Sequence, residues 1–200
     1  MKKIVCYGDS NTFGFNPIDS SRYDENIRWT SLLKKKLSVN YEVINEGMCN
    51  RTAFVDNPNG FIFSGAKHFK DFIQKSDNID ILILWIGTND LQFQYNISFS
   101  EIKNGLKNML TLAQTKAEKI ILIPPVILGE KILEGYFSNL FDKASILKSK
   151  DVGKIYKTLA DNYNCKFFDV NKFVKPSMID GLHYTEKSHK IIADKLVQLI

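Results

Sequence analysis

The sequence predicts an α/β protein in which a parallel β-sheet is covered by helices on both faces. Short apolar runs alternate along the chain with helix-length amphipathic segments, an order typical of parallel strands joined by crossover helices. Two of the runs, 81–86 and 120–123, are apolar throughout, as expected for strands that are buried on both faces. A length of 200 residues fits one domain, so we predict a single domain over residues 1–200.

Five segments are predicted to be strands and five to be helices. Apolar runs predict strands over residues 4–7, 41–44, 79–86, 119–123 and 166–168. Helical periodicity predicts helices over residues 29–37, 65–75, 100–117, 141–163 and 185–199. Ser98 and Glu101 match a capping box at the start of the third helix. The connection over residues 124–139 is expected to be irregular and to shape one rim of a ligand site.

Composition and charge argue against several classes of protein. The chain is 44% hydrophobic and 24% charged, as in globular proteins, and no apolar run approaches the roughly 20 residues that a spanning helix requires. The net charge of +5 comes from lysines mixed with acidic residues, so neither nucleic acid nor a membrane is an expected partner. Cys6, Cys49 and Cys165 are far apart and cannot form a disulfide framework, which suits a reducing compartment. The apolar N-terminal stretch is too short for a secretory signal. We therefore expect a cytoplasmic location.

Small polar motifs follow three of the predicted strands and precede the last helix. They are Gly8-Asp9-Ser10, Glu46-Gly47-Met48-Cys49-Asn50-Arg51-Thr52, Gly87-Thr88-Asn89-Asp90 and Asp180-Gly181-Leu182-His183. Each motif alone is compatible with an ordinary turn or helix cap. In open parallel sheets, however, ligands bind beyond the carboxyl ends of the strands. Four such motifs in this order therefore favour one functional site.

These motifs resemble the SGNH hydrolase superfamily, also called the GDSL-like esterases and lipases, over essentially the whole chain. Residues 6–14, 27–30 and 46–52 are similar to a bacterial subgroup of arylesterases and acyltransferases. The resemblance implies a flavodoxin-like, three-layer fold with a five-stranded sheet in the order 2-1-3-4-5. It also implies ester hydrolysis through an acyl-serine, with a small acyl ester as the substrate. The related acyltransferases form oligomers, which favours a homo-oligomer here.

The motifs supply the groups that acyl transfer requires. Ser10, just past the first strand, is the candidate nucleophile. His183 is the candidate base, and Asp180 can lie on the same turn and orient its imidazole. The GxSxG motif of ordinary α/β-hydrolases is absent. The three histidines have no metal-ligand spacing, so we expect neither a metal nor another cofactor.

The sheet order implied by the resemblance places three motif loops side by side. The expected oxyanion donors are the backbone N–H groups of Ser10 and Asn50 and the side-chain amide of Asn89. The wider family usually has glycine at the second of these positions. Gly47, three residues before Asn50, is therefore the alternative donor.

Several nearby residues have two interpretations. Cys49 could be a thiol nucleophile paired with His183, although a cysteine that merely lines a pocket is favoured. Arg28 and Arg51 could hold an anionic substrate or form structural ion pairs. Aromatic residues near the motifs could belong to the core or line an acyl or aryl pocket: Phe13, Trp29, Phe54, Phe61, Phe63 and Trp85.

The sequence as a whole predicts a serine esterase that hydrolyses small acyl esters, with acyl transfer as a related reaction. A carbohydrate acetylesterase, a thioesterase and a lysophospholipase are alternatives that would use the same triad. A non-catalytic binding module is less favoured, because binding alone requires no nucleophile, base and orienting carboxylate.

Overall fold

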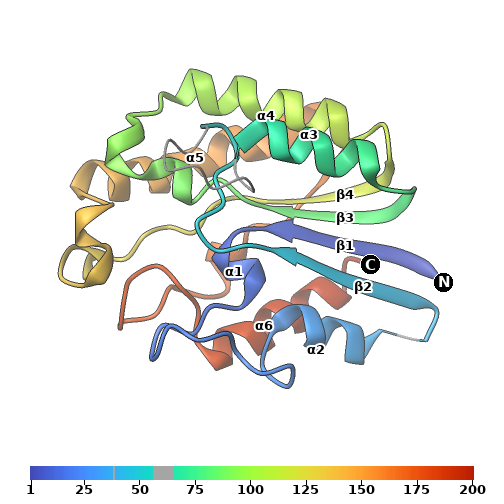
Figure 1. Cartoon of the computed structure of the whole chain (residues 1–200), viewed down its shortest axis with the longest axis horizontal. Helices are drawn as coiled ribbons and strands as arrows, with labels where there is room; N and C mark the ends of the chain where they lie inside the picture. The colour runs from blue at the N-terminus through green and yellow to red at the C-terminus, as the bar shows by residue number, and fades with distance from the viewer. Residues whose placement is uncertain (38, 56–64) are drawn as a thin grey trace.

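Within the part of the chain that the structure describes, five parallel strands form one sheet (Figure 1). The computed structural model describes residues 1–37, 39–55 and 65–200. The strands are β1 (Lys2–Gly8), β2 (Tyr41–Gly47), β3 (Ile79–Trp85), β4 (Ala117–Ile123) and β5 (Lys166–Phe167). Their order is β2-β1-β3-β4-β5, and every neighbouring pair is parallel. The predicted strands and the sheet order implied by the resemblance are therefore confirmed.

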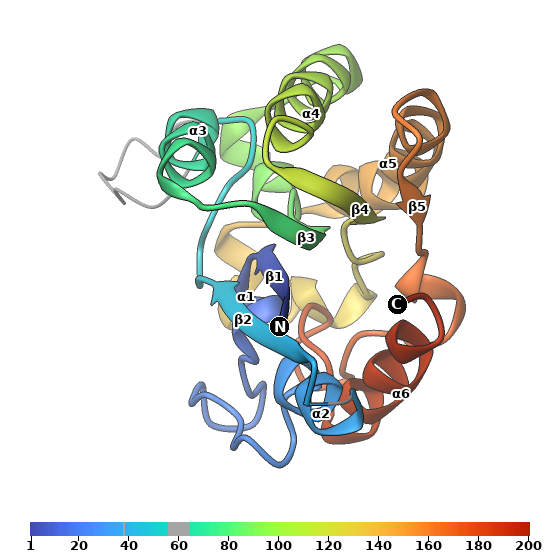
Figure 2. The same ribbon diagram turned by 90° about the vertical axis from the view of Figure 1, so that its right-hand side faces the viewer.

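Helices cover both faces of this sheet and complete a three-layer architecture. α3 (Gly65–Lys75), α4 (Phe99–Ala113) and α5 (Lys143–Asn162) lie on one face, while α2 (Trp29–Lys36) and α6 (Glu186–Val197) lie on the other (Figures 1 and 2). None of the described helices is long and apolar enough to cross a membrane. β1 lies between β2 and β3, so the winding direction reverses beside it, which is where open α/β sheets bind ligands.

The start of α4 follows the sequence prediction, whereas its end does not. The hydroxyl of Ser98 accepts from the backbone N–H of Glu101 at 3.2 Å, and the carboxylate of Glu101 accepts from the N–H of Ser98 at 2.8 Å. The predicted helix extended to Ala117, but α4 ends at Ala113. Ala117 instead begins β4 and pairs with Ile79 of β3. Because alanine has a high intrinsic helix propensity, the sequence favours a helix at Ala117. The pairing with β3 places this residue in a strand instead.

A short helix at the end of β1 was not predicted. It is α1 (Ser10–Phe13), and the carboxylate of Asp9 caps it by accepting from the backbone N–H of Asn11 at 3.0 Å. Four residues are too few to show helical periodicity. Gly47 lies directly against this helix, because a Cβ on Gly47 would come within 2.1 Å of the backbone nitrogen of Phe13. The end of β2 can therefore approach α1 only without a side chain.

A buried histidine joins the two helices on the α2/α6 face. Nδ1 of His189, on α6, accepts from the backbone N–H of Trp29, the first residue of α2, at 3.2 Å. The imidazole is 1% exposed and packs edge-on against Tyr23. Burial, and to a smaller extent the neighbouring His183, lower the pKa of His189 to about 3. The fold therefore contains a neutral imidazole in its interior at neutral pH.

We predict that this histidine makes folding sensitive to acid. The folded-state pKa lies below the unfolded value of about 6.5, so the unfolded chain binds the proton first and stability is lost as the pH falls through that range. His189 contributes a loss of roughly 2 kcal/mol at pH 5 relative to pH 7.5. Urea unfolding at both pH values should therefore show that the wild type loses roughly 2 kcal/mol more than His189→Asn, which can still accept from Trp29. An equal loss in both proteins would contradict the prediction.

Candidate active site

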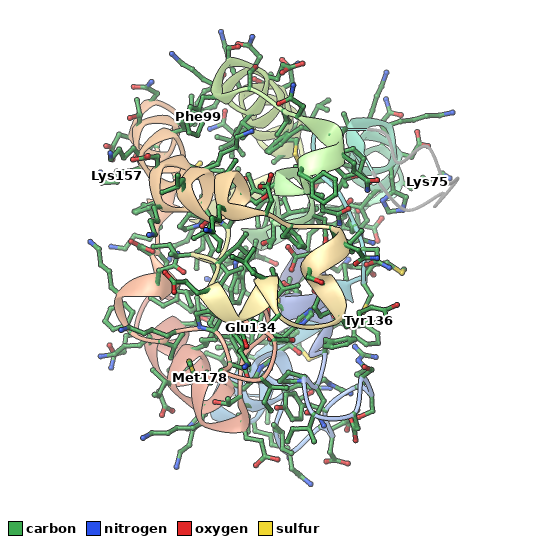
Figure 3. The ribbon with its side chains drawn as sticks, turned by 90° about the vertical axis from the view of Figure 1, so that its left-hand side faces the viewer. Lys75, Phe99, Glu134, Tyr136, Lys157 and Met178 are labelled. Atoms are coloured by element: carbon green, nitrogen blue, oxygen red, sulfur yellow. The ribbon has the colours of Figure 1, made fainter. Side chains whose placement is uncertain are left out.

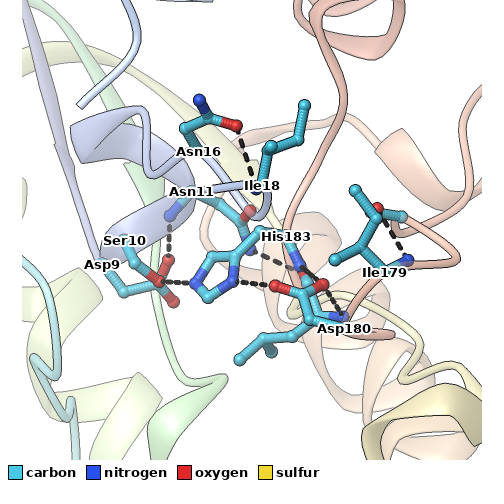
Figure 4. Close-up of polar contacts among 10 residues, drawn as sticks. Asp9, Ser10, Asn11, Asn16, Ile18, Ile179, Asp180 and His183 are labelled. Carbon is cyan, nitrogen blue, oxygen red and sulfur yellow. Dashed lines mark hydrogen bonds and ion pairs between the residues drawn. The ribbon is translucent and has the colours of Figure 1, made fainter. Parts of the chain in front are cut away.

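The structure brings Ser10, His183 and Asp180 together at the carboxyl end of β1 (Figure 4). Nε2 of His183 lies 2.9 Å from Oγ of Ser10, and Nδ1 lies 2.6 Å from Oδ2 of Asp180. Ser10 is placed by α1, whereas His183 and Asp180 come from the turn before α6. All three residues are buried. The predicted nucleophile, base and orienting carboxylate thus form one continuous hydrogen-bonded series.

Asp180 holds both the backbone of this turn and the imidazole. Its Oδ1 accepts from the N–H groups of Leu182 and His183 at 2.9 and 3.0 Å, while Oδ2 faces Nδ1 of His183. Gly181 has φ +69°, a conformation that favours glycine. Burial alone would raise the pKa of Asp180, but the interactions with His183 and the hydrogen bond from the N–H of Leu182 together outweigh it and lower the pKa. An ionised Asp180 favours the proton on Nδ1 and leaves the lone pair of Nε2 directed at Ser10.

Asn50 and Asn89 reach the same cavity as Ser10 and His183. Asn50 has φ +60°, in the left-handed region that asparagine tolerates better than most residues. This conformation explains how asparagine stands where the wider family usually has glycine. Gly47, the alternative donor, does not line the cavity, and its N–H already donates to Oδ1 of Asn45 at 2.9 Å. The geometry therefore favours Asn50 over Gly47.

The side chain of Asn89 is held in a fixed orientation. It begins a single 3-10 turn (Asn89–Leu91) after β3, and its Nδ2 donates to the carbonyl of Arg51 at 3.0 Å. Oδ1 of Asn89 accepts from Nε2 of Gln92 at 3.4 Å. An amide nitrogen carries two hydrogens, so one remains for a ligand in the cavity. The bond to Arg51 also ties Asn89 to the loop that carries Asn50.

Asp90 supports this loop in a role that the sequence did not reveal. Its carboxylate accepts from the backbone N–H groups of Ala53, Phe54 and Val55 at 2.8, 2.7 and 3.1 Å. Burial raises the pKa of Asp90 to about 6, although these hydrogen bonds oppose the shift. The motif Gly87-Thr88-Asn89-Asp90 draws attention to this aspartate. Its partners, however, lie 35–37 positions away and carry no recognisable side-chain signal.

Arg51 and Arg28 both bond to groups of the protein itself. Arg51 is buried, donates to the carbonyl of Gly8 at 3.0 Å and to that of Glu46, and stacks over Tyr7 at 4.3 Å. It therefore braces the ends of β1 and β2. Arg28 donates to the carbonyl of Tyr23 and to a carboxylate oxygen of Glu25. These contacts favour the structural interpretation of both arginines over substrate binding.

Cys49 lines the cavity but has the properties of an unreactive thiol. Burial, followed by the negative charge of Asp9, raises the pKa of Cys49 to about 11. A thiol with this pKa is protonated at neutral pH, whereas the thiolate is the nucleophilic form. Among the described residues, no group of three or more His, Cys, Asp or Glu side chains is placed to hold a metal ion.

The cavity that Ser10 lines has a volume of about 200 Å³. It is lined by Ser10, Phe15, Ser20, Cys49, Asn50, Asn89, Tyr136, Phe137, Leu140, Phe141, Leu182 and His183. Two of its aromatic side chains come from a 3-10 turn, Tyr136–Asn139, in the connection after β4. Tyr136 lies at the surface of this connection (Figure 3) and is 87% exposed. The connection therefore shapes one rim of the site, in agreement with the sequence analysis.

The aromatic residues of this cavity differ from those that the sequence suggested. Trp29 and Trp85 are fully buried in the core. Phe13 and Phe54 are half-buried but do not line the cavity. Phe61 and Phe63 lie outside the described residues.

Comparison with known proteins identifies the family. A family model for GDSL-like lipases and acylhydrolases matches residues 6–191. The chain belongs to this family. The protein is therefore a carboxylic ester hydrolase, and its fold places the family's Gly-Asp-Ser motif at the end of β1. A comparison with curated proteins gives no match.

Solved structures similar to this esterase share its fold over the whole chain. An inhibitor-bound aryl esterase from M. smegmatis is 25% identical, with a TM-score of 0.91 over 100% of this chain and 98% of that one. A carbohydrate acetylesterase from Sinorhizobium meliloti is 28% identical, with a TM-score of 0.88 over 100% of both chains.

We predict that Asp90→Asn weakens both stability and turnover. The amide presents an NH₂ group to buried N–H donors, which should lower the free energy of unfolding by about 1–3 kcal/mol. Displacement of the loop carrying Asn50 should lower kcat by about 10- to 100-fold. The matched control is Asp80→Asn, at the opposite end of β3, where Asp80 accepts from the N–H of Lys3. The control should retain its kcat; a loss of equal size in both variants would contradict a local role for Asp90.

Proposed function

We propose that the protein hydrolyses small acyl esters through an acyl-serine intermediate on Ser10. The observation that carries this proposal is the pair of hydrogen bonds from Ser10 Oγ to His183 Nε2 and from His183 Nδ1 to Asp180. A hydroxyl, an imidazole and a carboxylate in this series supply a nucleophile, a general base and the group that orients the base.

The reaction that follows from this geometry is acyl transfer in two steps. Oγ of Ser10 bonds to the ester carbon while its proton passes to Nε2 of His183. The carbonyl oxygen becomes an oxyanion, which the N–H groups of Ser10 and Asn50 and the amide of Asn89 stabilise. The bond to the alcohol oxygen then breaks, and that oxygen receives the proton from Nε2. In the second step, water attacks the acyl-serine with His183 as the base, which releases the acid and restores Ser10.

The size of the cavity supports a small substrate. Its volume of about 200 Å³ lies below the roughly 300–1,000 Å³ of typical small-molecule sites. An alcohol that replaces water in the second step would give acyl transfer at the same serine. A carbohydrate acetylesterase is a second candidate function, because an enzyme of that description is 28% identical over the whole chain. An acetyl group would fit the available space.

The cysteines and the packing of the sheet bear on the protein's location and on its domain organisation. Cys6, Cys49 and Cys165 are all free thiols. Free thiols are typical of reducing compartments, which supports our proposal of a cytoplasmic location.

We also propose that residues 1–200 form a single domain, because the helices of both outer layers pack on one five-stranded sheet.

The identity of the nucleophile can be tested by covalent labelling. We expect a fluorophosphonate probe to label the wild type and to fail with Ser10→Ala, because only an activated hydroxyl attacks the phosphorus. Cys49→Ala is the matched control, since it removes the other candidate nucleophile that lines the cavity, and it should still be labelled. Labelling that survives in Ser10→Ala and disappears in Cys49→Ala would overturn the assignment.

Replacing Asn89 tests whether its amide contributes to catalysis. Asn89→Ala should lower kcat by roughly 10²–10³, or about 2.7–4 kcal/mol, with little change in KM, because the bond to the oxyanion strengthens in the transition state. The melting temperature of the variant must be measured alongside kcat, since Asn89 also bonds to Arg51. A folded variant with near-normal kcat would show that Asn89 only holds the loop.

A further inference from the structure

A tyrosine on α5 reaches the stretch of chain between β3 and Asn89. Tyr156 is fully buried, and its hydroxyl donates to the carbonyl of Ile86 at 2.8 Å. Ile86 is the first residue after β3 and lies three positions before Asn89. The bond joins residues 70 positions apart, so it links α5 directly to the start of the loop that carries Asn89.

The backbone after Ile86 lies close against this hydroxyl. Gly87 has φ +112°, a conformation that residues with a side chain rarely adopt. A Cβ on Gly87 would lie 2.4 Å from Oη of Tyr156 and 3.2 Å from Cγ of Pro125. Glycine is therefore required here both by its backbone conformation and by the close approach of the tyrosine hydroxyl.

The hydroxyl of Tyr156 remains a donor at neutral pH. Burial, followed by the nearby negative charges of Asp90 and Asp9, raises the pKa of Tyr156 well above its ordinary value. The phenol therefore keeps its proton, and the bond to Ile86 persists. A phenylalanine would fill the same space without burying a polar group. The hydroxyl is thus explained by the carbonyl that it holds and not by packing.

The amide of Asn89 has to be aimed accurately if it is to act on an oxyanion. Its Nδ2 donates one hydrogen to the carbonyl of Arg51 and leaves the other for the cavity. The direction of this second hydrogen depends on the backbone that carries Asn89. A misplacement of about 1 Å in an active site can lower a rate by about 100-fold. A contact that fixes the backbone before Asn89 is therefore expected to affect catalysis.

We propose that Tyr156 is a positioning residue for ester hydrolysis, and that its hydroxyl holds the backbone after β3 so that the amide of Asn89 meets the oxyanion. The proposal rests on the proposed role of Asn89 as an oxyanion donor. Tyr156 does not line the cavity and acts only through Asn89. The site is then held from both faces of the sheet, because His183 precedes α6 on one face and Tyr156 belongs to α5 on the other.

Tyr156→Phe tests this role, because it keeps the buried ring and removes only the hydroxyl. We expect kcat to fall by about 5- to 50-fold with little change in KM, since the amide of Asn89 acts on the charge of the transition state. Complete labelling of Ser10 with a fluorophosphonate probe counts the folded enzyme, so an unfolded fraction does not lower the measured kcat. An unchanged kcat, or an effect on KM alone, would contradict the proposal.

Tyr163→Phe is the matched control. Tyr163 directly follows α5, and its hydroxyl forms a hydrogen bond of 3.3 Å with that of Thr111 on α4. The control variant loses a tyrosine hydroxyl without touching the chain after β3, and it should retain the kcat of the wild type. An equal loss in both variants would attribute the effect to general loosening around α5 and would overturn the positioning role.

A double-mutant cycle with Asn89→Ala separates positioning from a general structural effect. If Tyr156 acts through Asn89, Tyr156→Phe should change kcat by less than about 2-fold in the Asn89→Ala background. Independent effects are additive in free energy, so a general structural effect would lower kcat by the same factor in both backgrounds. Equal factors in the two backgrounds would therefore rule out the proposal.

Gly87→Ala disturbs the same contact from the backbone side and provides a second test should Tyr156→Phe not fold. Its Cβ would meet Oη of Tyr156, so the chain before Asn89 has to shift. We expect a lower kcat in the otherwise wild-type enzyme and no further loss in the Asn89→Ala background. A loss of equal size in both backgrounds, or no loss in either, would speak against positioning through Asn89.

The outcomes also distinguish this proposal from the proposed function. An enzyme in which Asn89→Ala lowers kcat and Tyr156→Phe does not contradicts the positioning role alone. A folded Asn89→Ala variant with normal kcat contradicts the oxyanion role of Asn89, and the positioning role is overturned with it.

Discussion

The hydrogen bond between Nε2 of His183 and Oγ of Ser10 joins residues 173 positions apart and depends on the packing of the whole α2/α6 layer. Ser10 is fixed by β1 and α1 near the start of the chain, whereas His183 precedes α6 near its end. His189 accepts from the backbone of Trp29, and the indole N–H of Trp29 donates to the carbonyl of Asn11 at 3.0 Å. Buried polar contacts thus run from α6 through α2 to α1, the helix that begins at Ser10.

The second requirement of the site is that the loops after β2, β1 and β3 keep a fixed separation. Side chains that bond to the backbone of a neighbouring loop meet this requirement: Arg51 bonds to Gly8, Asn89 to Arg51, and Asp90 to Ala53. A buried charge or polar group without partners is costly, so Arg51, Asn89 and Asp90 are each stable in the interior only while their bonds persist. The desolvated Asp90 and Arg51 therefore make correct loop placement a condition of folding.

Parts of this arrangement could be predicted from the sequence because they have a local signal. Apolar runs mark the central strands, the Ser98–Glu101 pair marks the start of α4, and the spacing of Asp180 and His183 fits one turn. Other parts have no local signal. Phe15 and Phe137 look like any core aromatics until the fold places both rings next to the imidazole of His183. The partners of Asp90 are backbone groups, which any sequence could supply.

The aromatic rings beside His183 have a consequence for the electrostatics of the site. His183 is 2% exposed, and Phe15 covers one face of its ring. Because water is kept from that face, the interaction between the imidazole and Asp180 operates in a less polar environment and is less screened. In the proposed acylation step, the positive charge that develops on His183 is stabilised by Asp180 and by the aromatic face of Phe15. Phe15, with its ring centroid 4.1 Å from the imidazole, is better placed for this contact than Phe137, whose centroid lies 5.4 Å away.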